Sequence, residues 1–317
     1  MGADTGGPSI VREYNPDGSV KASFNPFPGT TGGIRTAVAD LNGDGTPDIA
    51  VGTGPGTTAE VKVIDGKTGA VLFDILPFAD FTGGVFVAAG DITSDGVADL
   101  VITPDVTGGP RVVAYEGGDF KQVANFFGID DPNFRGGARA AVGDLTGDGH
   151  ADLVISAGFG GGPRVSIYDG AALLQGQYVH PVPDFFSFES TLRNGVYLAV
   201  GDVNGDYEND VVFGAGPGGG PRVLIVSGQD LLGKGSAAAI DAPIANFFAG
   251  DPSNRGGIRV GVKNLDGDQY ADVVTGAGQG GGSGVSTYLG KNLSTNTATE
   301  DFSFDAFPGY SGGIFVG

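Results

Sequence analysis

The sequence predicts an all-β fold: a six-bladed β-propeller of four-stranded blades, with the ring closed by N- and C-terminal segments that share one blade. Three observations lead to this fold class. The 317 residues include 61 glycines and 18 prolines, which disfavours long helices. An acidic nine-residue phrase recurs five times. The two ends of the chain resemble complementary parts of one repeat unit.

The repeat unit contains four short apolar runs. The phrase begins at Asp40, Asp91, Asp144, Asp202 and Asn264. One run precedes each copy and another follows it, as GIRTAVA and IAVGTG do around the first copy. A Gly-rich turn, a third run (GGPRV in three units) and a fourth run around a Phe pair complete the unit. Such runs predict strands, and four strands repeated about every 50 residues are typical of propeller blades, with a solenoid as the competing architecture.

The chain ends decide between these architectures. GADTGGPSIVREYNPDG near the N-terminus matches the later part of a unit, and FPGYSGGIFVG at the C-terminus matches its beginning. Together they form most of a sixth unit, which lacks the acidic phrase, and a blade shared between the termini closes a propeller ring. We therefore expect one domain over residues 1–317, with blades at approximately 34–80, 85–129, 138–189, 196–249, 258–308 and, for the closing blade, 314–317 plus 1–28.

The acidic phrase has the composition of a calcium site. Positions 1, 3, 5 and 9 carry carboxylate, amide or hydroxyl groups, and position 6 is usually glycine. Hard oxygen donors gathered in one tight turn are typical calcium ligands, and the carbonyl of position 7 adds a further oxygen. An EF-hand is excluded, because position 12 of the first copy is Val51 and strands flank the turn. The alternative is that Asp, Asn and Gly act only as turn formers.

Up to five Ca²⁺ ions are expected at these turns. The predicted ligands, with position 7 counted for its carbonyl, are Asp40, Asn42, Asp44, Thr46, Asp48, Asp91, Thr93, Asp95, Val97, Asp99, Asp144, Thr146, Asp148, His150, Asp152, Asp202, Asn204, Asp206, Glu208, Asp210, Asn264, Asp266, Asp268, Tyr270 and Asp272. Tyr207 and Gln269 stand where glycine is expected, so the fourth and fifth turns are expected to be strained or differently shaped.

The flanked phrases ADLNGDGTPDIAVG and VGDLTGDGHADLVISAG resemble the FG-GAP or VCBS-type repeats of integrin α-subunit propellers and of bacterial extracellular proteins. The resemblance covers nearly the whole chain. It implies a calcium turn between the first and second strands of a blade and an extracellular or cell-surface module for recognition or adhesion. Integrin propellers have seven blades, so six units and the recurrent GGPRV make this chain more similar to the bacterial proteins.

Arginine gathers at one end of the predicted ring. Strand connections alternate between the two ends of a propeller, so the acidic turns lie opposite the second-to-third-strand loops and the blade-to-blade crossovers. Nine of the ten arginines fall in or beside the latter set: Arg35, Arg111, Arg135, Arg139, Arg164, Arg193, Arg222, Arg255 and Arg259. Clustered guanidiniums suit carboxylates, sulfates or phosphates. Arg135, Arg193 and Arg255, in longer crossovers, are the ligand-binding candidates, and the alternative for the other six is pairing with neighbouring blades.

Charge and composition exclude several function classes. The formal charge of −20 disfavours nucleic-acid binding, because such a field repels a phosphate backbone. No apolar stretch is long enough for a membrane span, so membrane insertion is not expected. The chain has no cysteine, which excludes disulfides, Cys-ligated metals and thiol catalysis.

These observations predict a calcium-binding interaction or adhesion module whose ligand face lies opposite the calcium turns. The expected partner is a protein or an acidic polysaccharide, and the chain is expected to be a monomer or part of a longer surface protein. The alternatives are a carbohydrate-binding lectin and a structural spacer. An enzyme is not expected, and a polysaccharide-active enzyme is the less favoured alternative, because the histidines, His150 and His180, lie apart and no cluster of acid and base is evident.

Two further expectations concern packing. One phenylalanine per fourth strand is expected to pack between blades: Phe27, Phe78, Phe127, Phe186, Phe248 and Phe307. Insertions between third and fourth strands, at residues 171–183 and 229–243, are each long enough for a helical turn.

Overall fold

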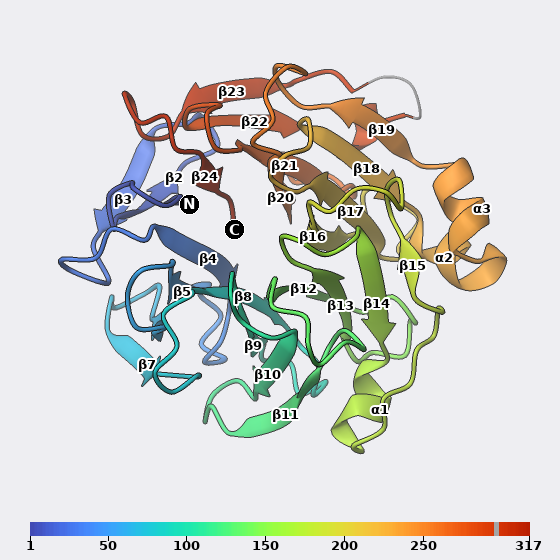
Figure 1. Ribbon diagram of the computed structural model, residues 1–317, viewed down its shortest axis with the longest axis horizontal. Helices are drawn as coiled ribbons and strands as arrows, with labels where there is room; N and C mark the ends of the chain where they lie inside the picture. Colours follow the sequence, from blue (N-terminus) through green and yellow to red (C-terminus); the bar gives the residue numbers. More distant parts are fainter. Residues whose placement is uncertain (295–297) are drawn as a thin grey trace.

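Six four-stranded antiparallel sheets form a ring around a central axis (Figure 1). This computed structural model describes residues 1–294 and 298–317. The innermost strand of each sheet contacts the innermost strands of both neighbours, and β24 contacts β4, so the ring is closed. The predicted six-bladed propeller is therefore confirmed, and the competing solenoid architecture is excluded.

The strands occupy equivalent places in every blade, and each blade is named after its innermost strand. The innermost strands are β4 (Ile34–Ala39), β8 (Val85–Gly90), β12 (Ala138–Gly143), β16 (Val196–Gly201), β20 (Ile258–Lys263) and β24 (Ile314–Phe315). The second strands are β5 (Asp48–Thr53), β9 (Asp99–Pro104), β13 (Asp152–Ala157), β17 (Asp210–Ala215), β21 (Asp272–Ala277) and β1 (Gly2–Ala3).

The outer half of each blade follows the same order. The third strands are β6 (Val61–Ile64), β10 (Arg111–Tyr115), β14 (Arg164–Tyr168), β18 (Arg222–Val226), β22 (Gly284–Tyr288) and β2 (Val11–Tyr14). The outermost strands are β7 (Val71–Ile75), β11 (Gln122–Phe127), β15 (Phe185–Phe186), β19 (Ala245–Phe248), β23 (Phe302–Asp305) and β3 (Val20–Phe24).

The two chain ends meet in the closing blade. In its sheet, β24 from the C-terminus pairs with β1 from the N-terminus, with Gly2 opposite Phe315 and Ala3 opposite Ile314. The hydroxyl of Tyr310 also donates to the carbonyl of Asp4 at 2.6 Å. Both labelled termini lie near the centre of the ring (Figure 1). Sharing one sheet between the ends completes the sixth blade and joins the first and last repeats into a closed ring.

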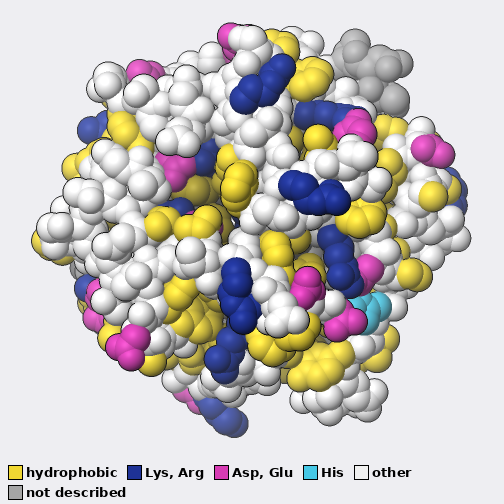
Figure 2. All heavy atoms as spheres, in the orientation of Figure 1, with side chains coloured by type: hydrophobic (Ala, Val, Ile, Leu, Met, Phe, Trp, Pro, Cys, Tyr) yellow, Lys and Arg dark blue, Asp and Glu magenta, His cyan; other side chains and the backbone are white. Residues whose placement is uncertain are grey.

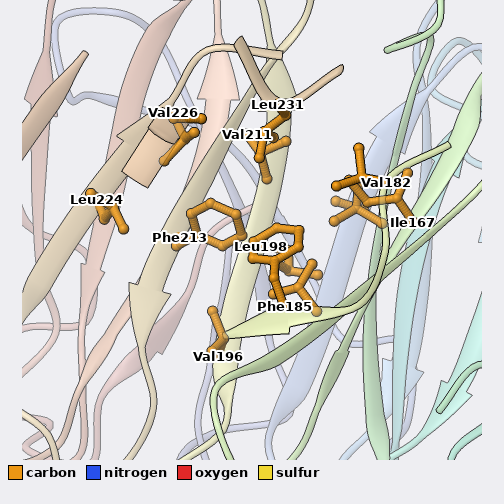
Figure 3. Packing of buried hydrophobic residues seen from close by; sticks show 14 of the residues in the cluster. Ile167, Val182, Phe185, Val196, Leu198, Val211, Phe213, Leu224, Val226 and Leu231 are labelled. Atoms are coloured by element: carbon orange, nitrogen blue, oxygen red, sulfur yellow. The ribbon is translucent and has the colours of Figure 1, made fainter. Parts of the chain in front are cut away.

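The core lies between blades. Every residue of β9, β13 and β17 is buried, because neighbouring blades cover both faces of each second strand. One cluster joins Val165 and Ile167 of β14 to Leu198 and Phe213 in the β16 blade (Figure 3). Phe213 is fully buried, and its ring meets that of Phe185 edge-on with centroids 6.2 Å apart. Apolar contact between sheets thus holds the ring together.

The phenylalanine expectation is wrong at three positions. Phe27 and Phe307 are buried, but Phe127, Phe186 and Phe248 are 54%, 47% and 53% exposed. Phe126 and Phe185 are buried in place of their exposed neighbours. Side chains alternate between the two faces of a strand, so in each Phe pair only one ring can face the adjacent blade.

Both insertions form helices. α1 (Gly170–Leu174) follows β14, and its cap residue Asp169 accepts a hydrogen bond from the N–H of Ala172. α2 (Gly228–Lys234) and α3 (Ser236–Asp241) follow β18 at the outer edge of the ring (Figure 1). A single-turn 3₁₀ helix, η1 (Gly290–Asn292), stands at the same place after β22. Within the described ranges, no helix combines the length and apolar character needed to cross a membrane.

Replacing Phe213 by Ala is expected to lower the free energy of unfolding by about 3–5 kcal/mol, because it opens a cavity between two blades. Urea unfolding followed by circular dichroism measures this loss. Phe248→Ala is the matched control, since its ring is half exposed, and it should cost far less. Equal losses from the two variants would show that packing between blades does not dominate stability.

Candidate functional site

The five acidic turns connect the first and second strands of their blades at one end of the ring. They are turn 1 (40–48), turn 2 (91–99), turn 3 (144–152), turn 4 (202–210) and turn 5 (264–272). In turn 3 the position-1 carboxylate of Asp144 accepts the N–H of Gly147 at 2.7 Å and that of Gly149 at 2.9 Å. Asp40 and Asp202 make the same kind of contacts in turns 1 and 4. The first side chain therefore shapes the turn by binding its backbone.

The position-9 carboxylate is fully buried in all five turns. In turn 2, Asp99 accepts N–H groups from Ile92 at 2.7 Å, Thr93 at 2.8 Å and Gly117 at 2.8 Å. The glycine always lies 18 residues after the aspartate. One carboxylate thus ties the end of the first strand and the turn after the third strand to the start of the second.

Burial raises the pKa of each position-9 carboxyl group, and it raises that of Asp210 to about 7. The glycines at the fixed offset are Gly66, Gly117, Gly170, Gly228 and Gly290. Sequence reasoning missed this glycine, although its constant spacing from the acidic phrase is a signal that could have revealed it.

The side-chain oxygens at positions 1, 3 and 5 are of the types that bind calcium. Positions 1, 3 and 5 lie at the partly exposed rim of each turn, where carboxylate, amide and hydroxyl oxygens are the hard donors that calcium prefers. Over residues 1–294 and 298–317, no three carboxylate or imidazole groups converge as a closed metal cluster. The position-9 carboxylates are engaged with backbone N–H groups. The position-1 carboxylates accept backbone N–H groups as well, so these contacts do not separate the two positions. Positions 1, 3, 5 and 9, with the carbonyl of position 7, remain the predicted ligands of a divalent cation.

Turns 4 and 5 depart from the others, as the sequence predicts. Tyr207 at position 6 has φ of 70°, the left-handed region that Gly45, Gly96 and Gly149 occupy in turns 1 to 3. Gln269 is absent from that region, so turn 5 has a different shape. There the ammonium of Lys291 pairs with Asp266, and it lies 3.0 Å from Asp268. Hydrogen bonds to these two carboxylates raise the pKa of Lys291. A built-in cation therefore covers the oxygens of turn 5.

At the opposite end, three consecutive crossovers present the arginine arc, defined as Arg135, Arg193 and Arg255. Each side chain is exposed, and each Nη1 donates to carbonyls of its own crossover, as Arg193 does to Ser190 at 2.8 Å and Leu192 at 2.7 Å. Among the described residues, none of the three is paired with a carboxylate. The arc therefore presents three guanidiniums that no salt bridge in this part of the chain engages.

Three of the exposed phenylalanines, Phe127, Phe186 and Phe248, lie on the outermost strands of three consecutive blades beside the arc. Across each sheet they stand opposite the arginine that starts the third strand: Arg111 opposite Phe127, Arg164 opposite Phe186, and Arg222 opposite Phe248. Figure 2 shows Lys and Arg side chains around the middle of the visible face, with Asp and Glu side chains among them. Half of the ring thus combines exposed guanidiniums with exposed aromatic rings.

Two clefts open beside the arc. One of about 230 Å³ is lined by Arg164, Phe186 and Arg193. The other, of about 820 Å³, has Asn254, Arg255 and Gln279 among its lining residues. Both offer a partner a recess next to positive charge.

Five of the other six arginines have a side-chain partner, and for Arg35, Arg222 and Arg259 this partner lies outside their own blade, as the alternative expects. Arg35 pairs with Asp105 at 2.6 Å, and Arg259 pairs with Asp4. Arg222 pairs with Glu189 at 2.9 Å, and Arg164 pairs with Asp184. Arg111 donates to the side-chain oxygen of Asn125 at 2.7 Å. These arginines stabilise the ring, whereas Arg139 has no carboxylate partner among the described residues.

The two histidines have structural partners. His150 Nδ1 lies 2.8 Å from the carbonyl oxygen of Ile92 in the neighbouring blade. His180, for which the sequence offers no evident partner, lies 3.3 Å from the carboxylate of Asp184. That carboxylate is also held by Arg164.

Comparison with known proteins identifies the repeat. Residues 91–155 match the FG-GAP-like repeat and residues 32–73 match the FG-GAP repeat. Integrin alpha-5 of Xenopus laevis is 27% identical over 272 residues, which cover 75% of this chain and 24% of that protein. Integrin alpha-7 of Rattus norvegicus is 29% identical over 151 residues, which cover 42% of this chain and 12% of that protein. The chain thus spans a quarter or less of the length of these relatives.

A solved structure shares the fold. A chain in a nidogen/laminin complex superposes with a TM-score of 0.54 at 10% identity, covering 96% of this chain and 92% of that chain. At this identity the likeness shows the fold alone. The two repeat matches, the integrin α relatives and the six-bladed ring support an FG-GAP-type propeller that resembles integrin α propellers.

Replacing Tyr207 by Gly is expected to stabilise the protein by about 1 kcal/mol, because glycine adopts positive φ without steric cost and the tyrosine ring is 82% exposed. Chemical denaturation measures the gain. Gln269→Gly is the matched control, because position 6 of turn 5 lacks positive φ, and it should bring no gain. A loss of stability in Tyr207→Gly would contradict the assignment of strain to this turn.

Proposed function

We propose that this FG-GAP-type propeller is a calcium-stiffened interaction module that binds an acidic partner protein through the arginine arc. The observation that carries the proposal is the position of Arg135, Arg193 and Arg255 in consecutive crossovers, exposed and without carboxylate partners among the described residues. A guanidinium binds a carboxylate through two parallel hydrogen bonds, so three of them present a strong site for acidic side chains.

The rest of the chain makes the arc selective. With a formal charge of −20, most of the molecule repels an acidic partner, so attraction is confined to the arginine-bearing face. Phe127, Phe186 and Phe248 add aromatic area beside the charge. Exposed aromatic and arginine side chains are the residues that contribute most to protein interfaces. This combination favours a folded protein as partner.

Calcium has a supporting role in this proposal. Bound at the acidic turns, the ion would neutralise carboxylates that otherwise repel one another. Asp144 and its equivalents shape the backbone, and the position-9 aspartates link it to the rest of the blade. The residues that would hold the ion are positions 1, 3, 5, 7 and 9 of turns 1 to 4. The acidic end thereby becomes a rigid base for the opposite end.

We propose a binding role rather than a catalytic one, because the arginine arc supplies positive charge and no nucleophile or general base. An extracellular or cell-surface setting accords with the resemblance to integrin α propellers. Carbohydrate binding is the second candidate, since the cleft of about 820 Å³ is lined by hydrogen-bonding groups of Asn254, Arg255, Gln279 and Ser286. Acidic polysaccharides would use the same guanidiniums.

Calcium titration is expected to give four sites per chain, because Lys291 already occupies the oxygens of turn 5. Isothermal titration calorimetry measures the stoichiometry, and excess EDTA should lower the melting temperature of the loaded protein. Lys291→Ala should add a fifth site, whereas Lys67→Ala, which removes a lysine 3.6 Å from Asp44 in turn 1, should not change the number. A melting curve unaffected by EDTA would contradict the calcium proposal.

Replacing Arg135, Arg193 and Arg255 together by Gln is expected to reduce binding of poly-L-glutamate at least tenfold, because each lost charge-assisted hydrogen bond weakens binding by about 1.5–3 kcal/mol. Biolayer interferometry at low salt measures the affinity.

The matched control carries Gln at three exposed lysines, Lys21, Lys121 and Lys234, and changes the net charge equally. It should bind almost as the unmodified protein does. Polygalacturonate, run in parallel, tests the carbohydrate alternative. Equal binding by the two triple variants would eliminate the arginine arc as the site.

A further inference from the structure

The mouth of the central channel is lined by alternating arginine and aromatic side chains. The second residue of each innermost strand is, in ring order, Arg35, Phe86, Arg139, Tyr197, Arg259 and Phe315. The three rings lie with centroids 5.8–6.3 Å apart. The guanidinium carbon of each of these three arginines lies 3.8–5.5 Å from the centroids of two of the three rings. Blades that place an arginine at the channel therefore alternate with blades that place an aromatic ring there, and this pair of blades repeats three times around the ring.

Two of the three guanidiniums receive a carboxylate from the next blade. Asp105 follows β9 and pairs with Arg35, and Asp4 follows β1 and pairs with Arg259. In each case Nη2 contacts the carboxylate, while Nη1 donates to a backbone carbonyl, that of Gly32 for Arg35 and that of Gly256 for Arg259. In both pairs, an arginine at the second position of an innermost strand binds one carboxylate through Nη2.

The third arginine lacks this partner. The position equivalent to Asp105 in the β16 blade is Gly216. A side chain cannot be accommodated there, because a Cβ at Gly216 would overlap the carbonyl oxygen of Asn194. Among residues 1–294 and 298–317, Nε and Nη1 of Arg139 have no hydrogen-bond partner, although only 4% of the residue is exposed. Arg35 and Arg259 each leave only Nε unpartnered.

The charges at the channel mouth therefore do not balance. In the part of the chain that the structure describes, these three guanidiniums pair with two carboxylates, which leaves one positive charge on Arg139. The rings of Tyr197, at 3.8 Å, and Phe86, at 5.5 Å, offset part of the cost of burying it. A buried cation normally requires a hydrogen-bonded counter-charge as well.

We propose that Arg139 binds one carboxylate at the mouth of the channel, in the role that Asp105 and Asp4 fill for its two counterparts. A carboxylate fits because it carries a single negative charge and is the group that both equivalent guanidiniums already hold. Phe86, beside Arg139, is partly exposed, and Figure 2 shows apolar side chains recessed near the centre of the face. The site is separate from the arginine arc and does not rest on the proposed function.

The test compares melting temperatures in sodium acetate and in sodium chloride at equal ionic strength and fixed calcium. Acetate is expected to raise the melting temperature of the unmodified protein by about 2 °C at concentrations well above its dissociation constant, because it binds only the folded state. In Arg139→Met this acetate-dependent rise should disappear. Arg139→Met should fold well, since it removes an unpaired buried charge.

Arg35→Met is the matched control. It leaves Asp105 unpaired and should lower the baseline melting temperature, but it should keep the acetate-dependent rise. If this control fails to fold, Lys21→Met, at an exposed position, takes its place. The proposal is overturned if chloride and acetate give equal melting temperatures in the unmodified protein, or if the rise persists in Arg139→Met.

A further pair of probes separates the two sources of a carboxylate. Acetyl-Gly-Asp-Gly-amide presents an acidic side chain, and acetyl-Gly-Asn-Gly-amide is its neutral counterpart. A larger rise from the Asp peptide than from acetate supports the side chain of a partner protein as the ligand, and equal rises support a free carboxylate. Equal rises from the Asp and Asn peptides count against the carboxylate site.

Discussion

The buried aspartate at the start of the second strand is the interaction on which five of the six blades depend. Its carboxylate binds backbone N–H groups from the end of the first strand and from the turn after the third, as Asp152 does with Leu145 and Gly170. Burying a carboxylate is costly, and this site tolerates it because N–H donors surround both oxygens. The glycine that supplies the third donor follows from the same constraint: a Cβ on Gly170 would overlap the carbonyl of Ala151.

Antiparallel strands then separate the charges of the molecule. Five of the six innermost strands run from a crossover to an acidic turn, so residues early in these strands lie at one end of the ring and the carboxylates lie at the other. Arg35 and Asp40 are only five residues apart, yet they belong to opposite ends. The result is a propeller with an acidic end suited to cations and an opposite end where guanidiniums gather. Support and recognition can therefore occupy different ends of one rigid ring.

Local patterns predicted the blades well but were less reliable for side-chain direction. The alternating runs around each phrase became paired strands, and the insertions became helices. The burial of the Phe pairs was predicted less well, because either ring of Phe126 and Phe127 could have faced the next blade. The sequence analysis expected Phe127 to be buried, and the structure buries Phe126 instead. The glycine 18 residues after each acidic phrase was overlooked, because its role arises only when the third strand folds back beside the turn.

The sequence by itself determined the number of blades, the closure of the ring by the two chain ends and the positions of the acidic turns, because these follow from short-range periodicity and turn chemistry. Tertiary structure alone decided which arginines are satisfied. Arg35, Arg139 and Arg259 stand at the same place in their strands, but their carboxylates come from the next blade, 70 residues away for Arg35 and 255 for Arg259. A partner supplied from so far along the chain has no local signal, so only the folded ring distinguishes Arg139 from its two counterparts.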